Sequence, residues 1–146
     1  MANFSDYFAG FLAEQLASGV STIGTLDNYK VALFKSGTTS AELAENNTDN
    51  ELDGMGYDRQ DITLKSYTPS TPGTGQFGVS YLANDGEIMF SPATAAWGVI
   101  THFAIIADTA GHGEQIVMWG GLNSPQQVNQ GDIFKFPDEG IKITLV

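Results

Sequence analysis

Cysteine is absent from this sequence, and positive charge is scarce. Without cysteine there is no disulfide framework to hold the fold together. Only 6 lysines and arginines stand against 17 aspartates and glutamates, which gives a formal net charge of −11 at pH 7. That charge argues against nucleic acid or an anionic membrane as a partner, because both are themselves negative. It favours solubility, or docking onto a basic surface.

Long apolar runs are absent as well. No stretch reaches the roughly 18 consecutive apolar residues that a membrane-spanning helix needs, and the N-terminus lacks the basic segment that opens a signal peptide. We therefore expect a protein that is made in the cytoplasm and has no membrane partner. Its 146 residues, 42% of them hydrophobic, are enough for a single globular domain over residues 1–146.

The residues that usually carry catalysis or bind metals are few. His102 and His112 are the only histidines, and the sequence has no Gly-x-Ser-x-Gly elbow, phosphate-binding loop or His-x-x-His pair. Without cysteine, a transition-metal site would have too few soft ligands. We predict no enzymatic activity, no cofactor and no metal site. Paired carboxylates for sugar hydrolysis stay open as an alternative, although most acids lie in polar loops where solvation explains them.

One acidic segment resembles the start of a calcium-binding loop. In residues 49–54 the acids fall at loop positions 1, 3 and 5 and a glycine at position 6. Position 12 would be Gln60, where a bidentate glutamate is needed. We therefore interpret the segment as a solvated acidic loop. His102 lies within an apolar run and is expected to be a core or cross-strand histidine, whereas His112 lies in a glycine-rich turn that we expect to be exposed.

The most apolar part of the chain is residues 88–122. From Trp97 onward both the odd and the even positions are largely apolar, which predicts a central strand over 97–106 that is covered on both faces. The glycine-rich residues 109–113 predict a turn, and residues 114–119 predict the returning strand. The rest of the chain has to cover this hairpin.

Aromatic side chains allow two interpretations. Core packing accounts for Trp97 and Trp119, because both lie in predicted strands. Tyr57, Tyr67 and Tyr81 flank loops, where exposed rings could stack on sugars. Glycan binding therefore stays open as an alternative.

The remaining apolar runs are short and separated by glycine, proline and asparagine. A long polar loop is expected at residues 35–55, with one helical turn at 41–44, and Asn84-Asp85-Gly86 predicts a tight hairpin turn. The pattern predicts a mainly β fold: an antiparallel sandwich or jelly-roll-like domain of about eight strands with one N-terminal α-helix. The predicted strands cover residues 29–34, 56–64, 77–82, 87–90, 97–106, 114–119, 133–136 and 141–146.

An N-terminal helix over residues 1–19 precedes the β domain of residues 20–146. Asn3 or Ser5 can cap its start, and Gly19 can end it. The helix either packs on its own sheet or serves docking and oligomerisation. It has no lysine or arginine, which argues against a membrane-surface role. Its apolar stripe comprises Phe4, Phe8, Phe11, Leu12 and Leu16, of which Phe4, Phe8, Phe11 and Leu12 are our candidate contact residues.

Several motifs together resemble a family of small virion proteins of tailed bacteriophages, whose members are often labelled tail-fibre-like or head-decoration proteins. The specific part is the Ala-Thr-x-x-Trp-Gly-x-x-Thr-His-Phe run of residues 93–103. The resemblance covers most of the chain. Its segments are Gly56–Gln60, Phe90–Ile105, Trp119–Leu122, Gly131–Phe136 and the Ile-Thr-Leu ending.

The resemblance implies a non-enzymatic structural protein of the phage particle, made in the host cytoplasm and assembled into the virion. It further implies a homo-oligomer, with a trimer favoured, whose partners are capsid or other virion proteins. Our first hypothesis is a capsid decoration or cement protein that binds the assembled shell at many equivalent sites. The alternative is a tail or tail-fibre component that contacts a host surface glycan.

Overall fold

Two layers of antiparallel strands form the part of the chain that the computed structural model describes, which is residues 2–18, 26–67, 80–109 and 113–145. The first layer is a five-stranded sheet. Its strands, in spatial order, are β1 (Ala2–Phe4), β8 (Gly113–Val128), β7 (Gly98–Thr109), β2 (Leu26–Lys35) and β3 (Gln60–Asp61). The sandwich class predicted from the sequence is therefore confirmed.

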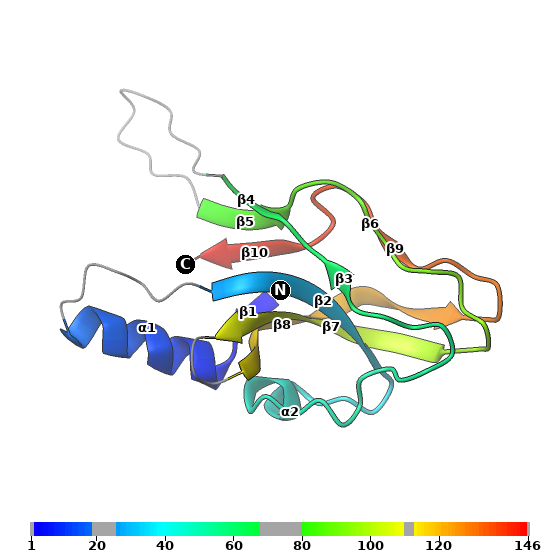
Figure 1. Ribbon diagram of the computed structural model, residues 1–146, viewed down its shortest axis with the longest axis horizontal. Helices are drawn as coiled ribbons and strands as arrows, with labels where there is room; N and C mark the ends of the chain where they lie inside the picture. Colours follow the sequence, from blue (N-terminus) through cyan, green and yellow to red (C-terminus); the bar gives the residue numbers. More distant parts are fainter. Residues whose placement is uncertain (1, 19–25, 68–79, 110–112, 146) are drawn as a thin grey trace.

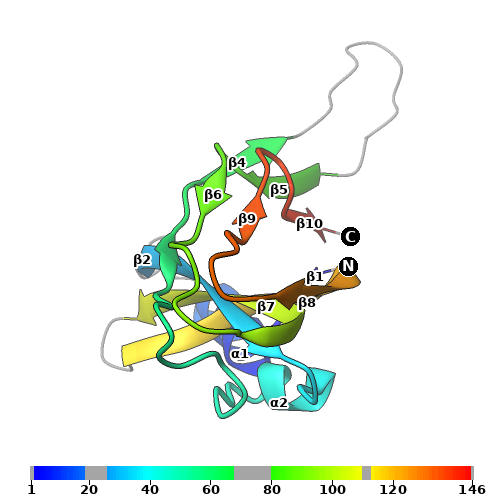
Figure 2. The same cartoon turned by 90° about the vertical axis from the view of Figure 1, so that its right-hand side faces the viewer.

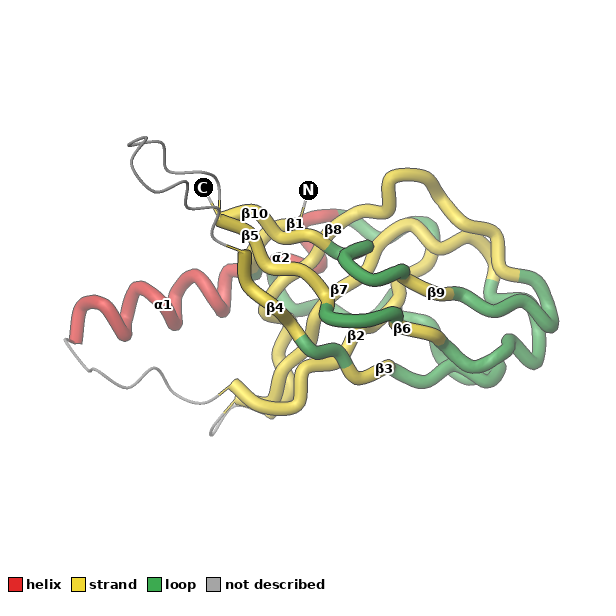
Figure 3. Tube along the Cα trace, turned by 90° about the horizontal axis from the view of Figure 1, so that it is seen from above, coloured by secondary structure: helices red, strands yellow, loops and turns green. Residues whose placement is uncertain are grey.

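The second layer consists of two smaller sheets that face the first (Figure 2). One contains three strands in the order β10 (Lys142–Leu145), β5 (Ser80–Asn84) and β4 (Leu64–Tyr67), and the other pairs β6 (Ile88–Met89) with β9 (Lys135–Phe136). The short helix α2 (Ser40–Ala44) lies on the outer side of the five-stranded sheet, and α1 (Asp6–Ser18) extends from one end of the molecule (Figures 1 and 3).

Strand β7 is the middle strand of the five-stranded sheet, and both of its faces are buried. Phe103 and Ile105 point into the space between the two layers, whereas Ala104 and Ile106 belong to a second apolar cluster on the side of α2. Full burial of a phenylalanine or isoleucine side chain contributes about 1.5–3 kcal/mol. The prediction of a central strand covered on both faces is confirmed.

The main core lies between the two layers and includes Trp97. The second cluster packs Leu43 of α2 against the outer face of the five-stranded sheet, where Trp119 and Phe34 also lie. Trp97 is 4% exposed and Trp119 9% exposed, so the core interpretation of both tryptophans is confirmed. The turn between β7 and β8 and the prediction for His112 lie partly or wholly outside the described residues.

The hairpin predicted over residues 77–90 is wrong. Strand β5 pairs with β4 and β10, whereas β6 pairs with β9. The turn residue Asn84 is fully buried, and its side-chain amide donates to the carbonyl oxygens of Gly86 at 2.7 Å and Pro137 at 2.9 Å, while its oxygen accepts from the Ile141 N–H at 2.8 Å. Asn84 thus holds two distant turns together and directs the chain out of one sheet and into another.

The single strand predicted over residues 56–64 is also divided between the layers. Strand β3 joins the five-stranded sheet, and β4 begins three residues later in the other layer. Ile62, between them, is 6% exposed, and its N–H donates to the Tyr29 carbonyl oxygen at 3.0 Å. Ile62 is therefore buried at the point where the chain passes from one layer to the other.

The polar segment predicted as a loop over residues 35–55 contains α2, as the predicted helical turn indicated. Thr39 caps this helix through its side chain, which accepts from the Glu42 N–H, and the Glu42 carboxylate accepts from the Thr39 N–H at 2.9 Å. This reciprocal capping box satisfies two backbone donors at the helix start. The Thr39 N–H holds the pKa of the Glu42 carboxyl below its usual range.

Candidate functional site

The N-terminal aromatic residues lie at a junction between a strand and a helix. The helix predicted from residue 1 begins only at Asp6, because residues 2–4 form β1 and pair with β8, Phe4 opposite Met118. Phe4 therefore lies on a strand, which corrects the prediction that placed it on the helix. Unpaired backbone groups at the β8 edge offer this strand hydrogen bonds that a helix could not use.

Ser5 fixes the direction in which α1 leaves the sheet. Its side chain is fully buried, its N–H donates to the Val117 carbonyl oxygen at 3.0 Å, and its hydroxyl oxygen accepts from the Phe8 N–H at 3.2 Å. The hydroxyl thus caps the helix start, as predicted for Ser5. Gly19, the predicted stop, lies outside the described residues, and α1 ends at Ser18.

Three of the four candidate contact residues line one apolar pocket. The ring centroids of Phe4 and Phe8 are 5.1 Å apart, and both side chains pack against the main core. The pocket has a volume of about 260 Å³. Its lining residues are Phe4, Phe8, Leu12, Tyr29, Leu64, Leu82 and Met118, so it lies between α1, the five-stranded sheet and the three-stranded sheet.

Phe11, the fourth candidate, lies on the other side of Phe8. Its ring stacks on Phe8 with centroids 6.3 Å apart, and it does not line the pocket. All four candidate side chains are only half-buried, and no described side chain of α1 is fully buried. Phe4, Phe8 and Leu12 therefore contact the molecule's own sheets, whereas Phe11 adds apolar surface beside them. The opposing wall of Tyr29, Leu64 and Leu82 was missed, because sequence periodicity does not reveal which strand faces a helix.

The acidic loop at residues 49–59 is organised by an arginine. Arg59 binds both oxygens of the Glu51 carboxylate, at 2.8 and 2.7 Å, and also contacts Glu114 of β8 at 2.7 Å. The Glu51 side chain is only 12% exposed, so it is not part of a solvated acidic loop as predicted, whereas Asp49 and Asp53 are exposed. Within the described ranges, no group of three or more histidines or acids could hold a metal ion.

Tyr57 connects this ion-pair cluster to the core. Its hydroxyl donates to Glu51 at 2.9 Å and accepts from the Leu33 N–H at 3.0 Å, and burial raises the pKa of the hydroxyl far above its usual value. Its ring packs edge-on against Trp97 at 5.7 Å. Hydrogen bonding to Glu51 raises the pKa of Arg59 as well. The cluster attaches the loop to β2 and β8.

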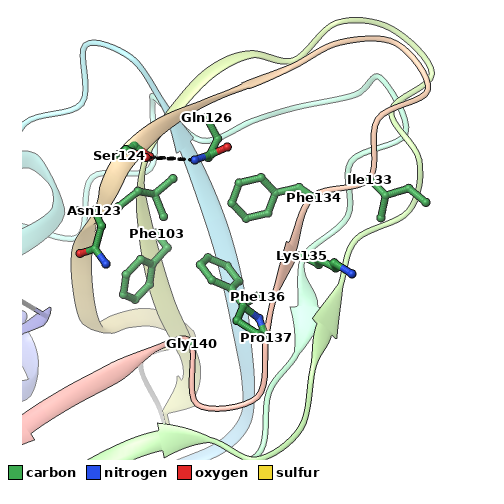
Figure 4. Close-up of a pocket in the computed structure, with 12 residues that line it drawn as sticks. Phe103, Asn123, Ser124, Gln126, Ile133, Phe134, Lys135, Phe136, Pro137 and Gly140 are labelled. Carbon is green, nitrogen blue, oxygen red and sulfur yellow. Dashed lines mark hydrogen bonds between the residues drawn. The ribbon is translucent and has the colours of Figure 1, made fainter.

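A larger concave surface lies between the end of β8 and the segment around β9 (Figure 4). It has a volume of about 620 Å³. Phe103, Phe134 and Phe136 line its apolar side, and Asn123, Ser124 and Gln126 line its polar side. We call it the β8–β9 groove. The groove was not predicted, because its two sides come from separate stretches of the sequence that only the fold brings together.

His102 occupies a mid-strand position on β7, as predicted, opposite Phe34 and Gly121. Its Nδ1 lies 2.9 Å from the Thr101 hydroxyl, and burial lowers the pKa of the imidazole. In the part of the chain that the structure describes, no carboxylate hydrogen-bonds to this ring. The described helices include none long and apolar enough to cross a membrane.

A family model described as podophage GP4 fiber I protein gp80 matches residues 3–144. The match begins within β1 and ends within β10, so it includes the N-terminal aromatic residues, the acidic loop and the β8–β9 groove. No curated protein matches the chain. The predicted resemblance to small virion proteins of tailed phages is confirmed.

Proposed function

The chain belongs to this family of podophage fiber proteins, and from that premise we propose that it is a structural subunit of a tail fibre, acting by binding rather than by catalysis. The match over residues 3–144 carries the proposal, because it includes nearly every described element. A virion fiber-type protein works in contact with other virion proteins, so its fold must supply at least one surface for them.

The face of α1 that carries Phe8 and Phe11 is the surface that best suits such a contact. It extends from one end of the two layers (Figure 1), and Phe11 stacks outside Phe8 instead of entering the apolar pocket. An apolar helix face of this kind gains free energy when a partner covers it, at about 25 cal/mol per Å² of buried apolar surface. Neighbouring copies of the chain would meet there in a homo-oligomer, for which we favour a trimer.

The alternative is a structural protein that decorates the capsid instead of forming part of a tail fibre. Cryo-electron microscopy of the intact particle distinguishes the two, because this fold would appear either along the tail fibres or at regular sites on the icosahedral shell. We expect density at the fibres. Density restricted to the shell would reject the fibre proposal and establish decoration.

A charge placed on each side of α1 tests the docking face. Phe11→Asp should prevent oligomer formation and incorporation into the particle, because burying an unpaired carboxylate costs several kcal/mol. Ala13→Asp is the matched control, since Ala13 is exposed and lies about 200° around the helix from Phe11. Size-exclusion chromatography with light scattering would measure the assembly. Equal behaviour of the two variants would exclude Phe11 from the interface.

A further inference from the structure

Three large hydrophobic side chains are exposed in the part of the chain that the structure describes: Met55 at 38%, Met89 at 51% and Ile133 at 50%. The segments that carry them lie toward the end of the molecule opposite α1 (Figures 1 and 3). Met89 pairs with Lys135 between β6 and β9, and Ile133 comes two residues before Lys135, so Met89 and Ile133 share the outer face of this small sheet. A single exposed hydrophobic residue is ordinary, but several together indicate an interaction site.

Backbone hydrogen bonds join the segments that form this end. The Thr94 N–H donates to the Met55 carbonyl oxygen at 3.0 Å. The Ala93 N–H donates to the Asp132 carbonyl oxygen at 3.0 Å, and the Ala93 carbonyl oxygen accepts from the Gly131 N–H at 2.7 Å. The three exposed side chains are therefore presented by one connected surface, which we call the tip surface. It comprises residues 53–58, 89–96 and 129–133.

Met55 is held in a backbone conformation that a side chain disfavours. Its φ of 54° lies in the left-handed region, as do those of Gly54 at 69° and Gly56 at 77°. Glycine adopts this conformation readily, whereas a methionine there costs free energy. The Met55 side chain gains little burial in return, because it stays exposed. Backbone strain of this kind concentrates at functional sites, so it points to a use of this side chain outside its own fold.

The tip surface has acidic residues and no basic ones. Asp53, Asp58 and Asp132 are exposed, and its three segments contain no lysine or arginine. The ion pairs of the described residues involve none of these three aspartates. Their charges are therefore left for a partner that brings lysine or arginine.

A second copy of the chain does not match the tip surface. The apolar face at the other end of the molecule belongs to α1, which carries Asp6 and Glu14 and no lysine or arginine. Contact between α1 and the tip surface would bring like charges together, as would contact between two tip surfaces, and like charges disfavour association. The charges therefore favour a different protein as the partner.

We propose that the tip surface binds a second kind of virion protein, through a segment that combines apolar anchor residues with lysine or arginine; this inference rests on the proposed function as a virion structural protein. Met55, Met89 and Ile133 would be buried against the anchors, and flexible methionine side chains adapt well to such a surface. The three aspartates would pair with the basic side chains around them, which gives the apolar centre and polar rim usual for a protein interface. The chain would then connect its own oligomer, formed at α1, to another component of the particle.

Site-specific crosslinking in the intact particle tests the inference. The photoreactive residue p-benzoylphenylalanine takes the place of Met89, whose exposure allows the change. After irradiation of purified particles, mass spectrometry should identify a crosslinked segment of another virion protein that contains lysine or arginine. Absence of crosslinks, crosslinks only to other copies of this chain, or a segment without basic residues would each overturn the inference.

The strained position gives a variant that separates binding from folding. Met55→Gly relieves the backbone strain, so thermal unfolding should occur at the same temperature or higher. Binding of the full chain to the purified protein identified by crosslinking should nevertheless weaken about tenfold, because one buried hydrophobic contact is lost. Asn28→Gly is the matched control, since Asn28 has a similar φ of 56° and lies outside the tip surface. Equal affinities of the two variants, or no binding of the purified pair, would overturn the inference.

A charge reversal tests the acidic rim. Asp53→Lys should weaken the same binding about fivefold at low ionic strength and less at high ionic strength. Asp61→Lys is the matched control, because Asp61 is an exposed residue of β3 outside the tip surface and the net charge changes equally. Equal losses in the two variants would contradict a specific acidic rim. The fibre function is tested separately, by the location of the protein on the particle, so failure of the tip contact and failure of the fibre proposal are distinguishable.

Discussion

Strand β7 and helix α1 differ most clearly in how far the fold buries their side chains. Residues 103–107 of β7 are all buried, with apolar clusters on both faces of the strand. No described side chain of α1 is fully buried, although the helix carries Phe8, Phe11 and Leu12. The centre of the sheet is thus stabilised by the chain itself, whereas the helix has apolar surface that its own sheets cover only in part. A substitution at the centre of the sheet should therefore affect folding, whereas a substitution on the helix should affect assembly.

The largest expected effect is at the centre. Trp97→Ala should lower the free energy of unfolding by about 3–5 kcal/mol, because it leaves a cavity in the main core. It also removes the indole N–H that donates to the Met55 carbonyl oxygen at 2.9 Å. Urea denaturation measures the loss. Met89→Ala is the control, since Met89 is 51% exposed, and a loss of similar size there would show that burial does not determine the effect.

Substitutions in the ion-pair cluster should lower the free energy of unfolding by less, and comparison of its two glutamates provides the control. Glu51→Gln should cost about 1–3 kcal/mol, because Arg59 loses its bidentate partner where the Glu51 side chain is 12% exposed. Glu114→Gln should cost less than about 1 kcal/mol, because the Glu114 side chain is 53% exposed and its ion pair is screened by solvent. Chemical denaturation of both variants tests the order, and the reverse order would contradict it.

On the helix, substitutions of two neighbouring phenylalanines should have different effects, one on folding and the other on assembly. Phe8→Ala should cost about 1–2 kcal/mol, because this half-buried side chain packs against the main core. Phe11→Ala should cost less than about 1 kcal/mol, since its ring stacks only on Phe8 among the described ring contacts, yet it should weaken oligomer formation. Thermal unfolding and light scattering on the same samples give both quantities. A Phe11 variant that assembles normally would place the interface elsewhere.

The smallest expected effect is the pH dependence due to His102. Burial lowers the pKa of this imidazole in the folded protein, whereas the unfolded chain takes up the proton near pH 6.5. Between these two values the unfolded state binds more protons, so stability falls as the pH falls. Nuclear magnetic resonance should give a His102 pKa below 6.5, and His102→Gln should remove this part of the pH dependence. A raised pKa would contradict the prediction.

The structural features that were predicted correctly are those that a local residue pattern determines. Both apolar faces of residues 97–106, the cap at Ser5 and the helical turn at 41–44 all depend on neighbours within a few positions. The strand division at Ile62 and the turn at Asn84 were not predicted, because each depends on contacts with distant segments. Asn84 is bonded to Pro137 and Ile141, more than fifty positions away, and no periodicity in the intervening chain records that contact.

The candidate sites show the same limit. The four residues Phe4, Phe8, Phe11 and Leu12 could be selected from their spacing, but the pairing of Phe4 with β8 could not, because it depends on a free strand edge formed by the distant hairpin. The β8–β9 groove combines Phe103 with Asn123, Ser124, Gln126 and residues 133–136. Its apolar and polar sides come together only when the fold brings these segments into one place.

The length of β8 has a mechanical consequence. Over its 16 residues this strand pairs with β1 at Met118–Gly120 and then supplies Asn123 and Gln126 to the lining of the β8–β9 groove. Ser5 joins α1 directly to β1, and these two lining residues belong to the partner strand β8 farther along. One strand therefore connects the base of α1 with the β8–β9 groove. Because β1 and β8 run antiparallel, their hydrogen bonds lie perpendicular to the strands, so a load along β8 would shear this three-residue ladder rather than open it one bond at a time.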